Sequence, residues 1–333
     1  MNTLPEGTIR CRVIRQQREQ YGIADEQGNE YAARVSGKYM NNAAAADDYP
    51  AVGDYVAARI EGDTAIIHAL FPRKSAFVRK VSGKTFAAQV VAANVDTVFL
   101  CMSLNENFNA RRMERYVAAA WESGARPVIV LTKADICSDV DAKLNELYSA
   151  APGVDIVAVC AMDGMGMDKL SPYIAKGETI AFVGSSGVGK STLINRLTGS
   201  DTMQTGAISG GGRGRNTTTH RELIPLANGA TLIDTPGMRE LGMMDAEAGI
   251  EAAFEDIEQA ARGCRFADCT HTNEPGCAVR AAIERGEISR ERFESYKKLS
   301  AENERAADAK AYLDAKRQKF KAIAKYNKNN RKT

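Results

Sequence analysis

The stretch GSSGVGKS, from Gly184 to Ser191, carries glycines, a lysine and a hydroxyl at the spacing of a phosphate-binding loop. Glycines let backbone N–H groups close around phosphate oxygens because no Cβ stands in the way. Lys190 is expected to reach the β- and γ-phosphates, and the Ser191 hydroxyl to ligate Mg²⁺. A flexible Gly/Ser loop is the alternative. A buried strand directly before the stretch and a helix after it favour the phosphate-binding loop.

A second motif, Asp234-Thr235-Pro236-Gly237, follows the apolar stretch from Ala230 to Ile233. A carboxylate at the end of a strand beside a phosphate loop is where Mg²⁺ is held, usually through water. The Gly237 N–H can reach the γ-phosphate because no side chain obstructs the approach. A simple strand-ending turn is the alternative. We predict that Ser191 and Asp234 hold Mg²⁺.

A glycine-rich segment, Gly206 to Thr219, lies between these two motifs. We predict a switch loop that is ordered when the γ-phosphate is present, with a threonine hydroxyl completing the Mg²⁺ shell. A disordered linker is the alternative. The sequence leaves Thr217, Thr218 and Thr219 open for this task, and we place it at Thr218. The predicted catalytic set is Lys190, Ser191, Thr218, Asp234 and Gly237.

The tetrapeptide Thr132-Lys133-Ala134-Asp135 stands at the end of the strand predicted over Val128 to Leu131. An aspartate there accepts hydrogen bonds from the N1–H and the exocyclic amine of guanine. Adenine offers an acceptor at N1 and no donor at C2, so it would leave the carboxylate unpaired. The Lys133 stem is expected to lie over the purine. With the phosphate loop, this motif selects GTP over ATP.

The dipeptide Cys160-Ala161 follows a further predicted strand, Ile156 to Val159, and a backbone N–H there is expected to meet the guanine O6. Many GTPases have Ser-Ala at this point, so Cys160 is a departure. The order is also unusual, because both base-recognition segments precede the phosphate loop. A domain whose termini lie close together can be joined and reopened elsewhere with its contacts intact. The sequence therefore predicts a circularly permuted GTP-binding domain.

A cluster of metal-ligand residues with the spacing C-x4-C-x-H-x5-C occurs near the C-terminus, at Cys264, Cys269, His271 and Cys277. Three thiolates and one imidazole suit a closed tetrahedral Zn²⁺ site of the structural type. A short segment with few large apolar residues gains folding free energy from such a site. Disulfide pairing is the alternative, and it would leave one cysteine over in a compartment expected to be reducing. We predict one structural Zn²⁺.

The elements that must position these motifs fall into three stretches of the chain. Residues 1–72 show short strands separated by turn signals, which predicts an OB-like β-barrel. Residues 73–243 alternate strand and helix, which predicts a parallel sheet covered on both faces by helices. Residues 244–333 are predicted to be helical around the Cys/His cluster and to end in a basic tail, Lys316 to Thr333. The barrel region also carries basic residues that we interpret as an ordinary solvated rim: Arg34, Lys38, Arg73, Lys74, Arg79 and Lys80.

The composition excludes a polycation, since the formal net charge is +2 and 26% of residues are charged. Contacts to nucleic acid must then come from local patches. The N-terminus lacks the basic and apolar regions of a signal peptide. No apolar run approaches the ~20 residues that a membrane span requires. We expect a cytoplasmic monomer with no membrane or DNA partner.

Four features together resemble the RsgA family, also called YjeQ: a β-barrel, TKAD before GSSGVGKS, the stretch GRGRNTTTHRE, and CRFADCTHTNEPGCAV. The resemblance implies an RNA-binding OB-fold, a permuted G domain and a C-terminal zinc domain. It implies hydrolysis of GTP to GDP, stimulated by the small ribosomal subunit with its rRNA, in late maturation of that subunit. By position, it places zinc at the four residues of the cluster and GTP contacts at Thr132, Lys133, Asp135, Gly184, Ser185, Ser186, Gly187, Val188, Gly189, Lys190, Ser191 and Thr192.

Two residues depart from patterns that such enzymes follow. Family members commonly have a histidine, proposed to act in hydrolysis, where this chain has Asn216. Met238 stands where Ras-like enzymes place a water-orienting glutamine, so slow unstimulated turnover is expected. A GTP-switched RNA-binding module with little hydrolysis is therefore the alternative function. A trafficking or signalling GTPase is disfavoured, because lipidation signals are absent and the chain has the Cys/His cluster and the basic tail.

Overall fold

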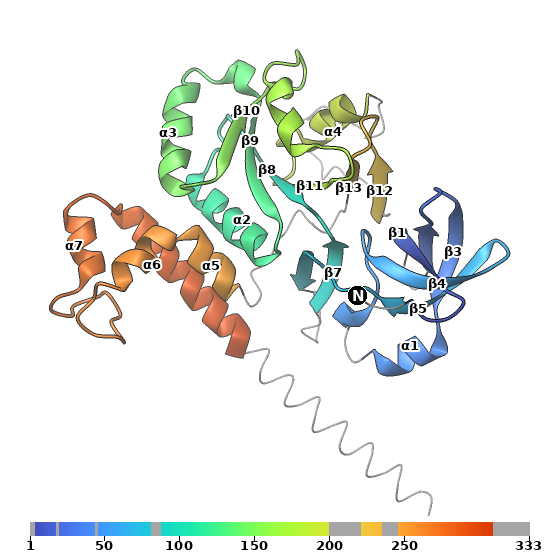
Figure 1. The fold of residues 1–333 in the computed structure, drawn as a ribbon. Coiled ribbons are helices and arrows are strands. Elements are labelled where there is room, and N and C mark those ends of the chain that lie inside the picture. The colour runs from blue at the N-terminus through green and yellow to red at the C-terminus, as the bar shows by residue number, and fades with distance from the viewer. Residues whose placement is uncertain are drawn as a thin grey trace, which may run out of the picture.

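A computed structural model gives the fold of the 333-residue chain and describes residues 4–17, 20–43, 46–80, 88–199, 221–234 and 246–308. At Lys80, Ala88, Arg221 and Asp234 it describes the backbone alone. Three parts follow one another along the chain: a β-barrel, a central sheet flanked by helices, and a group of helices (Figure 1). Among the described helices, none combines the length and the apolar character needed to cross a membrane.

The first part is a closed barrel with the strand order β1-β2-β3-β5-β4, in which β1 pairs with both β2 and β4. Its strands are β1 (Ile9–Gln17), β2 (Gln20–Ala24), β3 (Glu30–Val35), β4 (Tyr55–Glu61) and β5 (Thr64–Leu70). Alternate side chains point inward, so Val13, Ile23 and Ile67 are fully buried in one core. The barrel expected from the strand pattern is confirmed.

One short helix interrupts the strands of this region, which the sequence pattern did not predict. The helix α1 (Gly37–Asn42) and the 3-10 turn η1 (Ala46–Asp48) lie between β3 and β4. The Ser36 hydroxyl accepts a hydrogen bond from Tyr39 N at 3.1 Å and caps α1. The helix cap at Ser36 thus stabilises a helical turn in a region where the sequence pattern predicted only strands.

The central sheet contains five parallel strands in the order β10-β9-β8-β11-β13, and β12 joins β13 in the antiparallel sense. Its strands are β8 (Thr97–Ser103), β9 (Arg126–Thr132), β10 (Asp155–Ala158), β11 (Thr179–Val183), β12 (Arg221–Pro225) and β13 (Thr231–Asp234). The parallel strands are the ones that the sequence predicted. The short edge strand β12 was not predicted.

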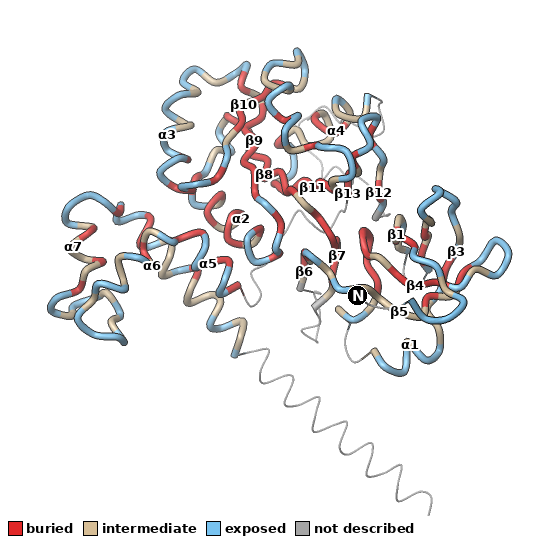
Figure 2. Tube along the Cα trace, viewed as in Figure 1, coloured by how far each residue is buried: buried red, intermediate tan, exposed pale blue. Residues whose placement is uncertain are grey.

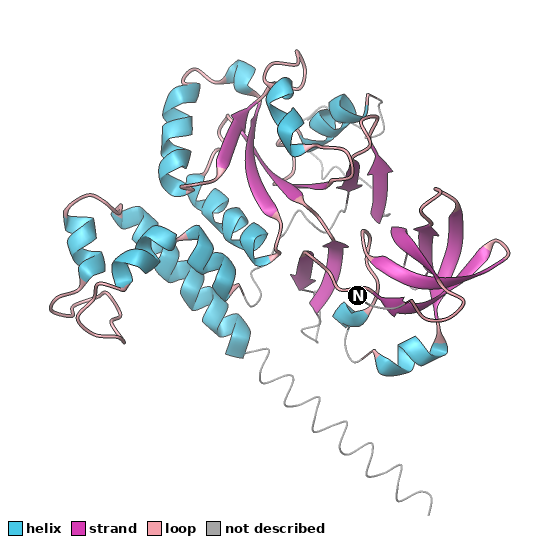
Figure 3. Ribbon diagram, in the orientation of Figure 1, coloured by secondary structure: helices cyan, strands magenta, loops and turns pink. Residues whose placement is uncertain are grey.

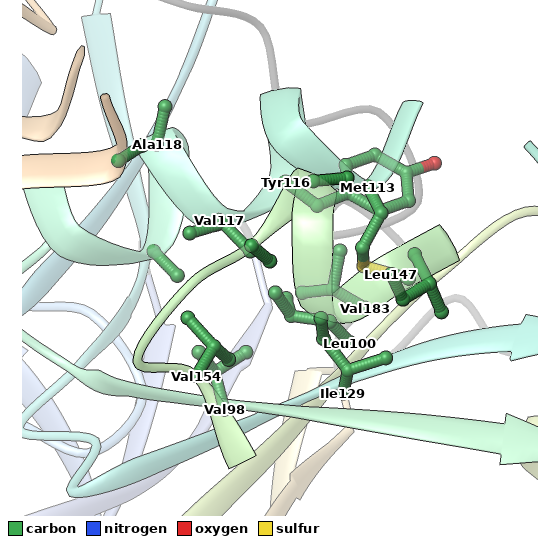
Figure 4. Close-up of a cluster of buried hydrophobic side chains, with 14 of the residues drawn as sticks. Val98, Leu100, Met113, Tyr116, Val117, Ala118, Ile129, Leu147, Val154 and Val183 are labelled. Carbon is green, nitrogen blue, oxygen red and sulfur yellow. The ribbon is translucent and has the colours of Figure 1, made fainter. Parts of the chain in front are cut away.

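Side chains of the central sheet alternate between two cores, so both faces are buried (Figure 2). The covering elements are α2 (Ala110–Glu122), α3 (Val140–Ala150), α4 (Lys190–Thr198) and the 3-10 helix η3 (Met167–Tyr173). Leu100 and Ile129 face α2 and α3 (Figure 4). Phe99 and Val128 face α4 and η3 on the other side. Parallel strands buried on both faces are the arrangement that the sequence predicted.

The barrel and the central sheet are joined, because β1 also pairs with β12. A hairpin of β6 (Ala76–Lys80) and β7 (Ala88–Ala93) lies beside this junction. Gly53 has φ +93, and a Cβ there would lie 2.1 Å from Ala93 O, so only glycine allows this approach. Arg73 pairs with the buried Asp54 in the junction, so this cation is not part of a free rim. Lys74 pairs with Asp96 but keeps an exposed side chain, as the predicted solvated rim requires.

The third part is helical and packs on α2 (Figure 3). It consists of α5 (Glu247–Ala253), α6 (Glu255–Ala261), α7 (Ala278–Glu284) and a helix over residues 290–308. Gly249 N donates to Glu122 Oε2 at 2.9 Å. Arg292 is 3% exposed and donates to Asp256 Oδ1 at 2.7 Å and to Ala150 O at 2.6 Å. This side chain ties the last helix to α6 and to the end of α3.

Candidate nucleotide site and metal centre

The segment predicted to bind phosphate leaves the carboxyl end of β11, a fully buried strand. A Cβ on Gly184 would lie 2.4 Å from Cys101 O, so no larger residue fits against β8. Gly187 and Gly189 have φ +79 and +94, and Gly189 is the N-cap of α4. Strand, loop and helix thus have the arrangement that directs backbone N–H groups toward a bound phosphate.

Lys190 is the first residue of α4 and folds back onto the loop. Its Nζ donates to Gly184 O at 2.5 Å and to Ser185 O at 2.7 Å. The positive charge is therefore kept at the loop rather than in solvent. Ser191 and Thr192 follow in the first turn of α4, as the sequence predicted.

The base-recognition segment lies at the same edge of the sheet, at the carboxyl end of β9. The Thr132 hydroxyl donates to Val188 O, and Leu104 N donates to Thr132 O at 2.9 Å. Thr132 is 3% exposed, so its hydroxyl forms a buried link between the base segment and the phosphate loop. The family resemblance implied a nucleotide contact for Thr132, and the sequence did not predict this link.

The chain turns sharply after Thr132. Lys133 has φ +58 and leads into the 3-10 helix η2 (Ala134–Ile136), which carries Asp135. A left-handed backbone is uncommon for a residue with a Cβ and is kept only where the surroundings hold it. Here Ala134 N donates to Val159 O at 3.3 Å, which packs η2 against the segment after β10. Asp135 is thus placed between the ends of β9 and β10.

The loop after β10 closes on itself through backbone hydrogen bonds. Cys160 N donates to Met165 O at 2.9 Å, and Gly164 N donates to Cys160 O at 2.9 Å. The Cys160 N–H is therefore occupied, whereas the Ala161 N–H has no hydrogen bond to any described residue. Of the two residues predicted to meet the guanine O6, Ala161 is the better donor candidate.

The remaining predicted residues fall at or beyond the limits of the described chain. Asp234 ends β13, beside β11, and the preceding Ile233 stands opposite Ala181. The backbone of Asp234 therefore lies at the edge of the sheet where the phosphate loop begins. Thr218 and Gly237 lie outside the described residues, as do Asn216 and Met238.

Four ligand-type side chains meet beside the start of α7. The ligand atoms of Cys264, Cys269, His271 and Cys277 all lie within 4.8 Å of one another. His271 Nδ1 is 3.6 Å from Cys264 Sγ and 3.5 Å from Cys277 Sγ. A tetrahedral metal with about 2.3 Å to sulfur and about 2.0 Å to nitrogen puts its ligand atoms about 3.5–3.8 Å apart. The two His271 distances match this spacing, and the four ligand atoms lie close enough together for one tetrahedral ion.

Glu274, which the sequence pattern missed, organises the loop that carries His271. Its carboxylate accepts hydrogen bonds from Thr270 N and Thr272 N at 2.9 Å each and from Asn273 N at 3.0 Å. Hydrogen bonding, first of all from the Thr270 side chain, lowers the pKa of Glu274 to about 2. The sequence did contain a signal for this role, namely an acidic residue between the last two predicted metal ligands. Its carboxylate holds the loop in which His271 faces the three cysteines.

Replacing Glu274 with glutamine should weaken metal binding by about 10–100-fold, as loss of an outer partner does at other metal sites. The amide nitrogen would face backbone N–H donors, so the loop would lose some of its hydrogen bonds. Competition with a chromogenic chelator measures the change. Glu284→Gln, at an exposed position in α7, is the matched control. Unchanged retention in Glu274→Gln would show that the loop forms without this carboxylate.

The chain is similar to proteins of one known family over most of its length. A family model described as RsgA GTPase matches residues 70–244. The "Small ribosomal subunit biogenesis GTPase RsgA 2" of Lactiplantibacillus plantarum is 48% identical over 302 residues, covering 90% of this chain and 85% of that protein. The "Small ribosomal subunit biogenesis GTPase RsgA 1" of Oceanobacillus iheyensis is 41% identical over 328 residues, covering 96% and 93%.

Two solved structures have a similar fold. YjeQ from Thermotoga maritima has a TM-score of 0.68 at 28% identity and covers 88% of this chain and 97% of its own. YloQ, described as a circularly permuted GTPase, has a TM-score of 0.65 at 24% identity, with 91% and 96% covered. The likeness extends over the barrel, the central sheet and the helical part, since both matches span most of the chain.

Proposed function

The chain belongs to the RsgA GTPase family, and from that premise we propose that it acts on the small ribosomal subunit during late maturation. GTP hydrolysis is the activity of the family. The curated relatives are named for biogenesis of the small ribosomal subunit, and they match nearly the whole chain rather than the G domain alone. The proposed partner is therefore that subunit with its rRNA, and subunit binding is proposed to stimulate hydrolysis.

One observation carries the nucleotide part of the proposal: the phosphate loop and the base segment meet at one edge of the sheet and are linked by the Thr132–Val188 hydrogen bond. We assign the phosphates to Gly184–Thr192. Guanine is assigned to Asp135, which accepts from its N1–H and amine, to the Lys133 stem, and to the Ala161 N–H. This set recognises GTP and GDP and rejects adenine nucleotides.

For hydrolysis we assign charge stabilisation to Lys190 and Mg²⁺ binding to Ser191 and Asp234, with Thr218 completing the shell and the Gly237 N–H facing the γ-phosphate. Bound Mg²⁺ neutralises charge that develops on the phosphates. This set contains no residue that orients the attacking water. Met238 has no polar group for this task, and Asn216 replaces the histidine that is common in the family. Slow turnover without the subunit is the expected consequence.

We propose three functional domains: an RNA-binding OB-fold barrel over residues 1–72, the permuted G domain over residues 73–243, and the helical metal domain with its basic tail over residues 244–333. The first helix of the metal domain packs on α2 of the G domain, where Gly249 would clash through any Cβ with Ala118 O at 2.2 Å. The permutation places the metal domain directly after Asp234 and Gly237 in the chain. A change at Asp234 and Gly237 on nucleotide binding can therefore reach the metal domain through a short stretch of chain.

The ion at the Cys/His cluster is proposed to be one structural Zn²⁺. Backbone donors support two of the three thiolates there, since Ala278 N lies 3.3 Å from Cys264 Sγ and Arg280 N lies 3.4 Å from Cys277 Sγ. Elemental analysis of protein purified without chelator should find one zinc per chain. Cys277→Ser should lose it, while Cys137→Ser, outside the cluster, should keep it. Iron, or a chain without metal, would refute this assignment.

Purified small subunits should raise GTP turnover by at least about tenfold, a threshold below the ~10³–10⁵ that stimulation in trans reaches in other GTPases. Association should weaken steeply as salt rises, because contacts to RNA phosphates release counterions. The Lys190→Ala protein, mixed with the same subunits, controls for contaminating GTPases. Tight GTP-dependent binding without stimulation would favour the alternative of a GTP-switched RNA-binding module. No binding at low salt would remove the ribosomal assignment and leave the GTPase.

A further inference from the structure

Arg12 belongs to the barrel strand β1, yet its guanidinium reaches the central sheet. Its Nη2 donates to Thr179 Oγ1 at 2.5 Å, and its Nη1 donates to Thr231 Oγ1 at 3.3 Å. These threonines are the first residues of β11 and β13 and stand opposite each other. The strand β11 ends at the phosphate loop, and β13 ends at Asp234. One barrel side chain thus bridges the two strands that lead to the nucleotide.

The surroundings of Arg12 exclude much of the solvent. Burial lowers its pKa, against the opposing effects of Tyr55 and Asp96, and its Cζ lies 5.3 Å from the centre of the Tyr55 ring. Its Nε has no hydrogen-bond partner among the described residues. A partly buried cation is a costly way to join two domains, because apolar packing achieves the same without desolvating a charge. What the guanidinium adds is a planar fork of donors that fixes two acceptors at once.

The barrel contacts β13 by two further routes. In the β1–β12 ladder Arg15 stands opposite Glu222, and Glu222 stands opposite Asp234 on the other side of β12. A Cβ on Gly53 would lie 3.0 Å from Ile233 Cδ1, so the loop before β4 is packed directly on β13. A shift of β13 therefore cannot occur without a response in the barrel, since close-packed interfaces do not deform continuously.

We propose that Arg12 is a positioning residue that couples the barrel to the nucleotide site by holding the starts of β11 and β13 in one arrangement. Coupling of this kind is reciprocal. The γ-phosphate would change how the barrel presents its surface, and a partner on the barrel would change turnover at the phosphate loop. Only the identity of that partner, the small subunit, rests on the proposed function.

Hydrogen–deuterium exchange of the full chain, bound to GDP or to a non-hydrolysable GTP analogue, tests the coupling without any partner. In the natural chain the analogue should change amide exchange in residues 9–17 by about fivefold or more relative to GDP. In Arg12→Gln this difference should disappear, while affinity for the analogue stays within about twofold, as Arg12 touches no nucleotide-binding residue. Arg59→Gln is the matched control, because it removes the same charge from the barrel, and exposed Arg59 on β4 pairs with Glu61 and lies outside the contacts to β11, β12 and β13.

A second variant, Thr179→Val, removes the nearer of the two acceptors on the sheet, so Arg12 no longer bridges β11 and β13, and it leaves the barrel unchanged. It should reproduce Arg12→Gln, and the double variant should add little to either, as expected for one shared interaction. A Thr179→Val chain that responds like the natural one would overturn the proposal. So would natural β1 amides that exchange equally with GDP and with the analogue.

Turnover with small subunits separates this proposal from the proposed function. In the presence of small subunits, kcat of Arg12→Gln should be about tenfold lower than that of the natural chain. KM for GTP and unstimulated turnover should be unchanged. Equal stimulation of Arg12→Gln and the natural chain would overturn the coupling and keep the ribosomal function. If subunits neither bind nor stimulate the natural chain, the ribosomal function fails, and the exchange experiment still decides the coupling.

Discussion

Lys190→Ala is expected to lower kcat for GTP hydrolysis by about 10²–10³, the largest effect on turnover that we predict. The ammonium is already held at the phosphate loop by Gly184 O and Ser185 O. On nucleotide binding it would stabilise charge on the phosphates, and alanine offers nothing in its place. The fold should survive, because the lost hydrogen bonds end on loop carbonyls rather than in a core. Single-turnover phosphate release measures the effect apart from product dissociation.

Lys169→Ala is the matched control for this experiment, since Lys169 is an exposed lysine on η3 of the same domain. It should keep both turnover and stability. Near-normal hydrolysis by a well-folded Lys190→Ala protein would contradict the assignment of the phosphate loop. A thermal melt of both variants shows whether a loss of turnover reflects the site or the fold.

Asp135→Asn is expected to reverse base preference from GTP to XTP. The carboxylate accepts from the guanine N1–H and amine, whereas an amide can donate to the carbonyl that xanthine has at C2. A site built for a specific hydrogen-bond pattern rejects a mismatch strongly, by about 10⁴–10⁵ at the upper end, because buried polar groups are left unpaired. Competition between labelled GTP and XTP gives the ratio directly.

Asp141→Asn controls for the loss of a negative charge near the site, because Asp141 is exposed in the first turn of α3. It should leave the preference for GTP unchanged. If Asp135→Asn still prefers GTP to XTP, the base contact lies elsewhere, and the placement of η2 between β9 and β10 does not serve base recognition.

Short sequence patterns were sufficient to propose much of this site. The phosphate loop, the segment around Asp135 and the Cys/His cluster each lie within 14 consecutive residues or fewer, so residue type and spacing are enough to predict their chemistry. The alternation of strand and helix likewise predicted the five parallel strands, because a strand buried on both faces has a near-continuous apolar sequence. Glu274 is the exception, since its role depends on how one short loop bends back on itself.

Contacts between distant residues were decided by the tertiary structure alone. Thr132 and Val188 are 56 positions apart and Arg12 and Thr179 are 167 apart, and no local pattern marks them as partners. The pairing of β1 with β12 is of the same kind, because an edge strand accepts whichever neighbour the packing of both domains brings to it. The choice of Ala161 over Cys160 as donor also needed the folded loop, where Met165 O takes one N–H and leaves the other. The chemistry of each motif was thus readable from its own residues, while the links that hold the motifs together depend on folding of the whole chain.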